Sequence, residues 1–193
     1  PRQSVPIVLC DAGDGLVAGI ADILAFAGWT DIAILDGGVD AWEAAGFPLF
    51  SGVNVPSKGF GEYIEAKFGT PHISAETLNQ MQHSGEDLVI LDSRPFTEFN
   101  SLSIPGGIDA PGAELVQRVK TVAPNPNTTI VVNCAGRTRS IIGAQSLINA
   151  GVPNPVVALE NGTMGWMLAG LDCARGNTNL APEPNQAAND WAR

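Results

Sequence analysis

The stretch TTIVVNCAGRTRSIIGAQSLINAG, residues 128–151, decides the fold. It opens with an apolar run rich in β-branched residues, passes through a short loop of small and basic residues, and continues with the periodicity of a helix. Similar strand and helix patterns alternate along the whole chain, which is typical of an α/β fold with a parallel sheet flanked by helices. We expect strands at residues 5–9, 32–35, 88–92, 129–133 and 156–159.

The same reasoning predicts helices at residues 17–27, 75–82, 112–122 and 140–150. Ser74 stands directly before one of them, where its hydroxyl can accept a backbone N–H of the first turn. Gly28 and Gly151 directly follow two others, at the place where a helix commonly ends in a left-handed residue. These flanking residues support the helix boundaries.

A second stretch, VPIVLCDAGDGLVAGIADILAFAG at residues 5–28, aligns without a gap with residues 128–151. Such self-similarity indicates a repeated unit. Residues 71–122, which precede the second copy, have no counterpart before Pro1. We therefore expect the C-terminal half of one domain at 1–50, a linker with a short helix from about Glu62 at 51–70, a complete domain at 71–175, and a tail or linker at 176–193.

Composition excludes several classes of function. The chain has 20 acidic residues against 10 Lys and Arg, a net charge of −10, so its overall field repels nucleic acid and anionic membranes. Three cysteines and two histidines form neither a disulfide framework nor a metal-binding pattern. We expect no nucleic-acid or membrane partner, no metal and no cofactor. Reduced thiols and the lack of any apolar run of roughly 18 residues favour the cytoplasm.

Cys134 follows a predicted strand and precedes a loop that joins it to a helix. Small residues let successive backbone N–H groups of such a loop form an anion-binding nest, to which the helix N-terminus adds partial positive charge. This cradle favours a thiolate nucleophile. The alternative is a buried cysteine whose loop arginines meet solvent or nearby acids. The loop consists of Ala135, Gly136, Arg137, Thr138 and Arg139, and the helix begins near Ser140.

The segment 72–175 resembles a complete rhodanese (thiosulfate sulfurtransferase) domain. LDSRPFTEFNSLSIPGGIDAPG at 91–112 is similar to that family's LDxRxxxEFxxGHIPGAxNxP segment, and CAGRTRS at 134–140 to its active-site loop. ALENGTMGWMLAG at 158–170 resembles the family's VLxGGxxxWxxxG ending, as does LDGGVDAWEAAGFPL at 35–49 in the first copy. The departures are Leu102, Ser103 and Asn161, where the family usually has Gly, His and Gly, and we expect them to loosen the surrounding loops.

The resemblance implies an active site on the loop 134–139. Cys134 would take the outer sulfur of thiosulfate, become a persulfide and pass the sulfur to cyanide or a thiol. Arg139, alone or with Arg137, would hold the anionic donor. Charge on the transferring sulfur would be stabilised by backbone N–H groups. These belong to the loop residues Ala135, Gly136 and Thr138 and to Ser140.

Two further sites follow from the alignment and the strand order. Asp92 and Arg94 end another predicted strand and would reach the same rim of the sheet, either beside the site or as a pair that pins a loop. In the first copy Asp11 stands where the second has Cys134, so we expect that copy to be inactive. Its apolar strand faces need cover, either from a homo-oligomer contact or from the missing part of the first domain.

The sequence alone leaves two alternative functions open. A phosphatase or arsenate reductase-like enzyme also combines a cysteine and an arginine in an oxyanion-binding loop. That pattern is C-x5-R, whereas only four residues separate Cys134 from Arg139. A non-catalytic module that senses persulfides or docks a partner is the second alternative. Two arginines beside the cysteine favour turnover over sensing.

Overall fold

The computed structural model describes residues 5–47 and 55–192. The chain divides into two compact units, Pro1–Val53 and Asn54–Arg193. Among the described residues, no helix combines the length and the apolar composition that a membrane crossing requires.

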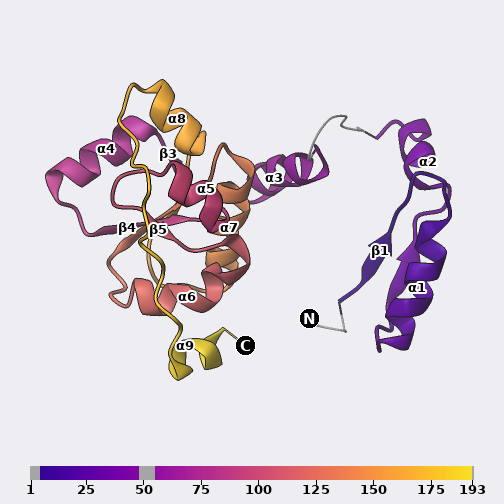
Figure 1. Cartoon of the computed structure of the whole chain (residues 1–193). Helices are drawn as coiled ribbons and strands as arrows, with labels where there is room; N and C mark the ends of the chain where they lie inside the picture. Colours follow the sequence, from indigo (N-terminus) through magenta and orange to yellow (C-terminus); the bar gives the residue numbers. More distant parts are fainter. Residues whose placement is uncertain (1–4, 48–54, 193) are drawn as a thin grey trace. The chain divides into compact units, whose positions relative to one another are not determined.

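The second unit is built on a five-stranded parallel sheet with the order β3-β7-β6-β4-β5. Strands β3, β4 and β5 of this sheet are labelled in Figure 1. Three strands have the expected bounds, because each is a continuous apolar run long enough to recognise. They are β4 (Leu88–Asp92), β6 (Thr129–Asn133) and β7 (Val156–Leu159). The other two, β3 (His72–Ile73) and β5 (Ile108–Asp109), were not expected, since two residues are too few to show a pattern.

Two of the expected helical segments of this unit begin at the expected residues, Ala75 and Gly112. Ser74 caps α4 as expected, since its hydroxyl oxygen accepts the N–H of Thr77 at 3.2 Å. The segment predicted as one helix at 112–122 begins with a 3₁₀ turn, η1 (Gly112–Glu114), and continues as α6 (Leu115–Val122). The remaining helices are α3 (Val55–Phe68), α4 (Ala75–Ser84), α5 (Phe96–Ser101), α7 (Thr138–Asn149), α8 (Gly162–Leu168) and α9 (Gln186–Trp191).

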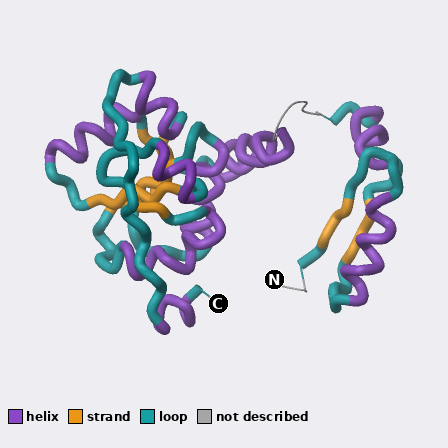
Figure 2. The backbone as a smooth tube through the Cα atoms, in the orientation of Figure 1, coloured by secondary structure: helices purple, strands orange, loops and turns teal. Residues whose placement is uncertain are grey.

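Helices cover both faces of the sheet, which lies in the middle of the unit (Figure 2). Side chains of β6 alternate between the two faces, as a strand requires. Ile130 and Val132 join a core with α6 and α7, whereas Val131 joins a core with α4 and α8. All three are fully buried, and each such side chain contributes about 1.5–3 kcal/mol through burial.

The segment expected to be a linker is a longer helix than the sequence indicated. Helix α3 begins at Val55, not near Glu62, and packs along α7 within the second unit. A Cβ at Gly61 would lie 2.8 Å from Thr138 Cγ2, so glycine permits this close approach. The start of the helix was missed because Gly and Ser residues dominate the sequence there.

The tail at 176–193 packs against the second unit through most of its length. Its backbone pairs with the edge strand β5, where the N–H of Ala181 donates to the carbonyl oxygen of Asp109 at 2.9 Å. Helix α9 then packs against α6 and buries Ala188. The tail therefore covers an otherwise open sheet edge.

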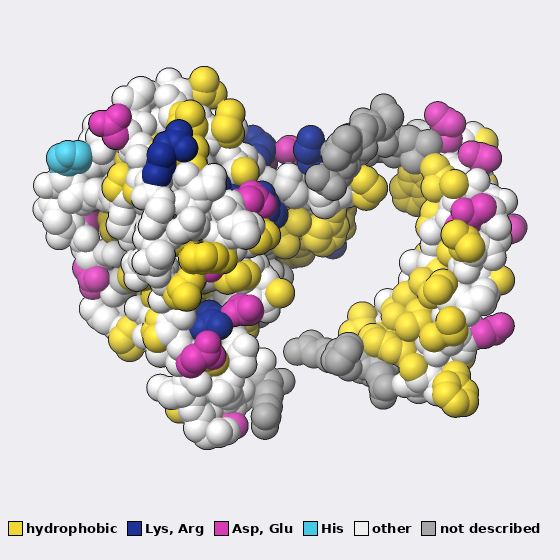
Figure 3. Space-filling model, in the orientation of Figure 1, with side chains coloured by type: hydrophobic (Ala, Val, Ile, Leu, Met, Phe, Trp, Pro, Cys, Tyr) yellow, Lys and Arg dark blue, Asp and Glu magenta, His cyan; other side chains and the backbone are white. Residues whose placement is uncertain are grey.

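The first unit contains two parallel strands, β1 (Ile7–Leu9) and β2 (Ile32–Ile34), and two helices, α1 (Leu16–Phe26) and α2 (Gly38–Ala44). Of its described residues only Gly38 is buried. Figure 3 shows hydrophobic side chains gathered along it, and Val8 and Phe26 are 67% and 96% exposed. Trp42 lies against Phe47, with ring centroids 4.4 Å apart, and is 39% exposed. The expected cover for this face stays a prediction.

Candidate active site

Cys134 is the first residue after β6, at the rim where neighbouring parallel strands end. Asp92 at the end of β4 pairs in register with Asn133 at the end of β6, so both strands finish at the same edge of the sheet. In α/β proteins this edge is the usual place for a ligand. The Cys134 side chain is buried, and its thiol donates to Ser140 Oγ at 3.6 Å.

In the loop at Cys134, the backbone carbonyl groups and the backbone N–H groups differ in their hydrogen bonding. The carbonyl oxygens of Cys134 and Ala135 accept the N–H groups of Thr163 and Met164, at 2.8 and 3.0 Å, from the first turn of α8. In contrast, no hydrogen bond among the described residues uses a backbone N–H from Ala135 to Ser140 as donor. Together with the start of α7, these N–H groups form a site suited to an anion.

Helix α8 approaches the loop so closely that only glycine fits at its start. A Cβ on Gly162 would lie 2.3 Å from the carbonyl oxygen of Cys134, and the φ of Gly162 is 54°. The preceding residue, Asn161, has a φ of 55°, a left-handed conformation that asparagine tolerates better than most side chains. Asparagine, which stands where the resemblance places a glycine, is thus accommodated in a left-handed conformation.

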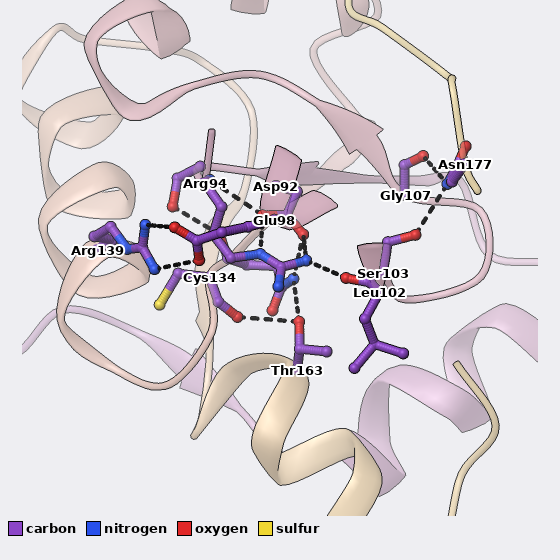
Figure 4. Close-up of polar contacts among 12 residues, drawn as sticks. Asp92, Arg94, Glu98, Leu102, Ser103, Gly107, Cys134, Arg139, Thr163 and Asn177 are labelled. Atoms are coloured by element: carbon purple, nitrogen blue, oxygen red, sulfur yellow. Dashed lines mark hydrogen bonds and ion pairs between the residues drawn. The ribbon is translucent and has the colours of Figure 1, made fainter. Parts of the chain in front are cut away.

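Both loop arginines, to which the resemblance assigned the anionic donor, are paired with carboxylates. Arg139 forms two hydrogen bonds of 2.9 Å with Glu98 of α5 (Figure 4). These bonds lower the pKa of Glu98 and raise that of Arg139. Arg137 pairs with Glu62 and Glu65 of α3. The arginines thus meet nearby acids, as that alternative expected, whereas the role of Cys134 as a nucleophile stays a prediction.

A pocket of about 560 Å³ opens over Cys134. Its walls are the loop from Cys134 to Arg139, Glu98, and two residues of α3, Ser57 and Lys58. The last two were not candidates from the sequence, because Lys58 lies about 75 positions before Cys134 in a segment without apolar periodicity. Only the docking of α3 on α7 brings them to the site.

Asp92 and Arg94 form a buried ion pair that does not line this pocket. Arg94 Nε donates to Asp92 Oδ1 at 2.8 Å and Nη2 donates to Oδ2 at 2.7 Å. Arg94 Nη2 also donates to the carbonyl oxygen of Leu102 at 2.6 Å (Figure 4). Asn133 Nδ2 donates to Asp92 Oδ2 at 2.8 Å. The pair ties two strand ends to the segment after α5, which fits a structural role.

The departures from the motif do not loosen their surroundings, contrary to expectation. Ser103 is fully buried, and its hydroxyl accepts a hydrogen bond of 3.1 Å from Asn177 Nδ2. Its backbone exchanges two hydrogen bonds with Ala174, of 2.9 and 2.8 Å. The chain after α8 therefore holds this loop from outside, by contacts between residues about 70 positions apart.

Asp109 occupies the position of the motif's asparagine and was missed as a candidate. It is 5% exposed, and its Oδ1 has no hydrogen-bond partner among the described residues. Burial, and then repulsion by Asp92, raise the pKa of Asp109 to about 6. The quoted motif would have signalled this residue through the change from a neutral amide to an acid.

In the loop after β1 of the first unit, the Asp11 carboxylate accepts hydrogen bonds from backbone N–H groups of the loop and of the helix that follows it. Asp11 Oδ1 accepts the N–H of Gly13 at 3.0 Å, and Oδ2 accepts that of Val17 at 3.4 Å. These bonds, that of Gly13 foremost, lower the pKa of Asp11. The carbonyl oxygen of Asp11 accepts the N–H of Val39 at 3.0 Å, much as that of Cys134 accepts the N–H of Thr163.

The other two cysteines have different surroundings from Cys134. Cys10, the residue after β1, is exposed. Cys173 is half-buried, and burial raises the pKa of its thiol, which disfavours the thiolate there.

Comparison with known proteins identifies the second unit. A model of the rhodanese-like domain family matches residues 74–169, which include the strand β6, Cys134, the loop and α8. The chain therefore belongs to the rhodanese-like family. Its parallel sheet with helices on both faces is the rhodanese fold, as expected, and the family is one of sulfurtransferases.

Three known proteins are similar to this rhodanese-like chain. A crystal structure of thiosulfate sulfurtransferase from Pseudomonas aeruginosa is 51% identical, with a TM-score of 0.74, over 100% of this chain and 37% of that one. The crystal structure of the Alr3790 protein from Anabaena sp. is 26% identical, with a TM-score of 0.50, over 53% and 80%. "Putative sulfur carrier protein YrkF" of Bacillus subtilis (strain 168) is 30% identical over 109 residues, 56% of this chain and 57% of that protein.

The chain thus spans about a third of the Pseudomonas aeruginosa protein and just over half of YrkF.

Proposed function

We propose that this protein is a sulfurtransferase that takes sulfane sulfur from thiosulfate or a persulfide and passes it to cyanide or a thiol through Cys134. One observation carries the proposal: a buried thiol stands beside a loop whose backbone N–H groups, from Ala135 to Ser140, make no hydrogen bond within the described chain. Such a cradle stabilises negative charge that develops on the transferring sulfur. The 51% identity with a thiosulfate sulfurtransferase supports the same chemistry.

The proposed reaction has two displacement steps. The Cys134 thiolate attacks the outer sulfur of thiosulfate, the S–S bond of the donor breaks, and sulfite leaves with the electron pair. Cyanide then attacks the terminal sulfur of the Cys134 persulfide, whose S–S bond breaks to give thiocyanate and the original thiolate. With a thiol acceptor, the thiol loses its proton and becomes the persulfide. Neither step needs a cofactor.

In this proposal the residues of the site have different roles in the reaction. The N–H groups of Ala135, Gly136, Thr138 and Ser140 hold negative charge on the transferring sulfur. Arg139 and Arg137 contribute as positioning residues, because Glu98 and the α3 carboxylates neutralise much of their charge and fix the loop. Asp92 and Arg94 hold the strand ends from which the loop starts. The partners are a small anionic donor and a small acceptor.

We also propose that the first unit is the C-terminal half of a second rhodanese-like domain without a nucleophile. Its β1 and β2 pair in the register that β6 and β7 use at aligned positions, Ile7 with Ile32 and Ile130 with Val156. Asp11 stands where Cys134 would be and occupies its own loop.

Thiosulfate treatment followed by mass spectrometry tests the function. We expect one added sulfur, about 32 mass units, on the Cys134 peptide, and its removal by cyanide. Cys134→Ser should abolish both the added mass and thiocyanate formation. Cys173→Ser is the matched control and should retain them, because its thiol lies outside the pocket. Thiocyanate formation by the Cys134→Ser variant at the original rate would show the assignment to be wrong.

A further inference from the structure

The pocket over Cys134 contains one cation whose charge no described carboxylate opposes. Arg139 is opposed by Glu98, and Arg137 by two carboxylates of α3. Lys58 lines the same pocket, and it makes no hydrogen bond or ion pair with any residue that the structure describes. Among the pocket-lining residues, Lys58 is therefore the cation available to an incoming anion.

Lys58 is carried by a helix that is fixed to the active loop. Helix α3 packs along α7, with Gly61 against Thr138, and two of its carboxylates hold Arg137. Lys58 precedes Gly61 by three residues, or nearly one helical turn, so it lies on the side of α3 that meets the loop. Its flexible stem ends in a compact, strongly hydrated charge, which suits an exposed pocket rim.

We propose that Lys58 selects anionic sulfur donors for Cys134, a specificity role that rests on the proposed function. A donor such as thiosulfate carries two negative charges, and the Glu98–Arg139 pair in the pocket wall offers it no net positive charge. The loop N–H groups act only on the atoms that reach them, whereas the Lys58 ammonium acts on the part of the donor still at the pocket mouth. Because Lys58 is exposed to solvent at the pocket rim, its attraction for the donor is moderate and decreases with salt concentration.

Steady-state kinetics with thiosulfate and cyanide provide the first test. Lys58→Gln should lower kcat/KM for thiosulfate about five- to tenfold, mainly through KM, and Lys58→Arg should restore most of it. The loss should shrink at high ionic strength, which a structural defect would not cause. Lys67→Gln is the matched control, because Lys67 lies on the last turn of the same helix, over the rings of Tyr63 and Phe68 at 5.3 Å. That variant should behave like the wild type.

Alkylation of Cys134 tests the inference without sulfur transfer. Iodoacetate is an anion and iodoacetamide is neutral, so the ratio of their rates at the Cys134 peptide reports anion attraction. Lys58→Gln should lower this ratio several-fold, while Lys67→Gln should leave it unchanged. If the wild type accepts no sulfur but the ratio still falls, the proposed function is wrong and the role of Lys58 in anion selection stands. If Lys58→Gln matches Lys67→Gln in both assays, the inference is overturned.

Discussion

Asp109 shows how one side chain can set the pH dependence of stability. Its carboxyl is buried beside Asp92, and these two effects raise its pKa from 3.8 to about 6 in the folded protein. The folded state therefore holds a proton that the unfolded state releases between about pH 4 and 6. The protonated carboxyl of Asp109 therefore stabilises the folded state at low pH. This contribution to the free energy of unfolding decreases as the pH rises from about 4 to about 6, and it does not change further above about pH 6.

We expect Asp109→Asn to raise the free energy of unfolding at pH 7 by on the order of 1–2 kcal/mol, because the amide needs no proton to stay neutral. At pH 4 the gain should nearly vanish. Denaturant unfolding at the two pH values measures both effects, with the exposed Asp172→Asn as control. An equal gain at pH 4 and pH 7 would contradict the role of ionisation.

At the scale of elements, the sequence predicted those parts whose pattern is long and local. Strands β4, β6 and β7 have their expected bounds, because each contains at least three consecutive apolar residues in a strand of four or five. Two-residue strands such as β3 and β5 have no pattern to read. They form because the backbone beside β7 and β4 already offers unpaired groups.

The candidate site was predicted where it depends on one continuous segment, from Cys134 to Ser140. Its electrostatics were not predicted, because they depend on contacts between distant residues. Glu98 reaches Arg139 from 41 positions away, and Glu65 reaches Arg137 from 72. Neither spacing has a signature in the sequence, since only the packing of α5 and α3 around the loop creates these pairs.

The contact between α3 and α7 predicts an unusual response to Gly61→Ala. Alanine normally stabilises a helix interior by up to about 1 kcal/mol relative to glycine. Here the new Cβ would lie 2.8 Å from Thr138 Cγ2 and 3.3 Å from its Cα, so α3 must move away from the loop. We expect a loss of on the order of 1–3 kcal/mol in stability and a several-fold loss of sulfur transfer.

Gly19→Ala is the control for this prediction, because Gly19 is also helical and a Cβ there meets nothing within 4 Å. Thermal unfolding and thiocyanate formation should be unchanged or slightly improved in that variant. Similar behaviour of both variants would mean that α3 is not held against the loop in solution.

On the scale of the whole molecule, the chain contains two loops of similar backbone arrangement in different surroundings. In both, the carbonyl oxygen of the key residue, Asp11 or Cys134, accepts an N–H from the start of a following helix. The loop of the second unit has α3 and α5 beside it, with their paired arginines and Lys58. Within the described part of the first unit, the corresponding loop positions are Asp14 and Leu16, and no arginine is present.

This difference predicts that Asp11→Cys will not create a second sulfur-transfer site. In a Cys134→Ser background, the new cysteine would stand after β1 beside the N–H groups of Gly13 and Val17, which the aspartate now occupies. Backbone donors alone would then be present, without the pocket walls that α3 and α5 supply beside Cys134. We expect the double variant treated with thiosulfate to gain no more sulfur at residue 11 than at Cys10, the exposed neighbour that serves as an internal control. Peptide mass spectrometry measures both positions in one sample. Loading of the new cysteine at the rate of wild-type Cys134 would show that the loop backbone suffices, and that α3, α5 and their charged side chains are not needed for the chemistry.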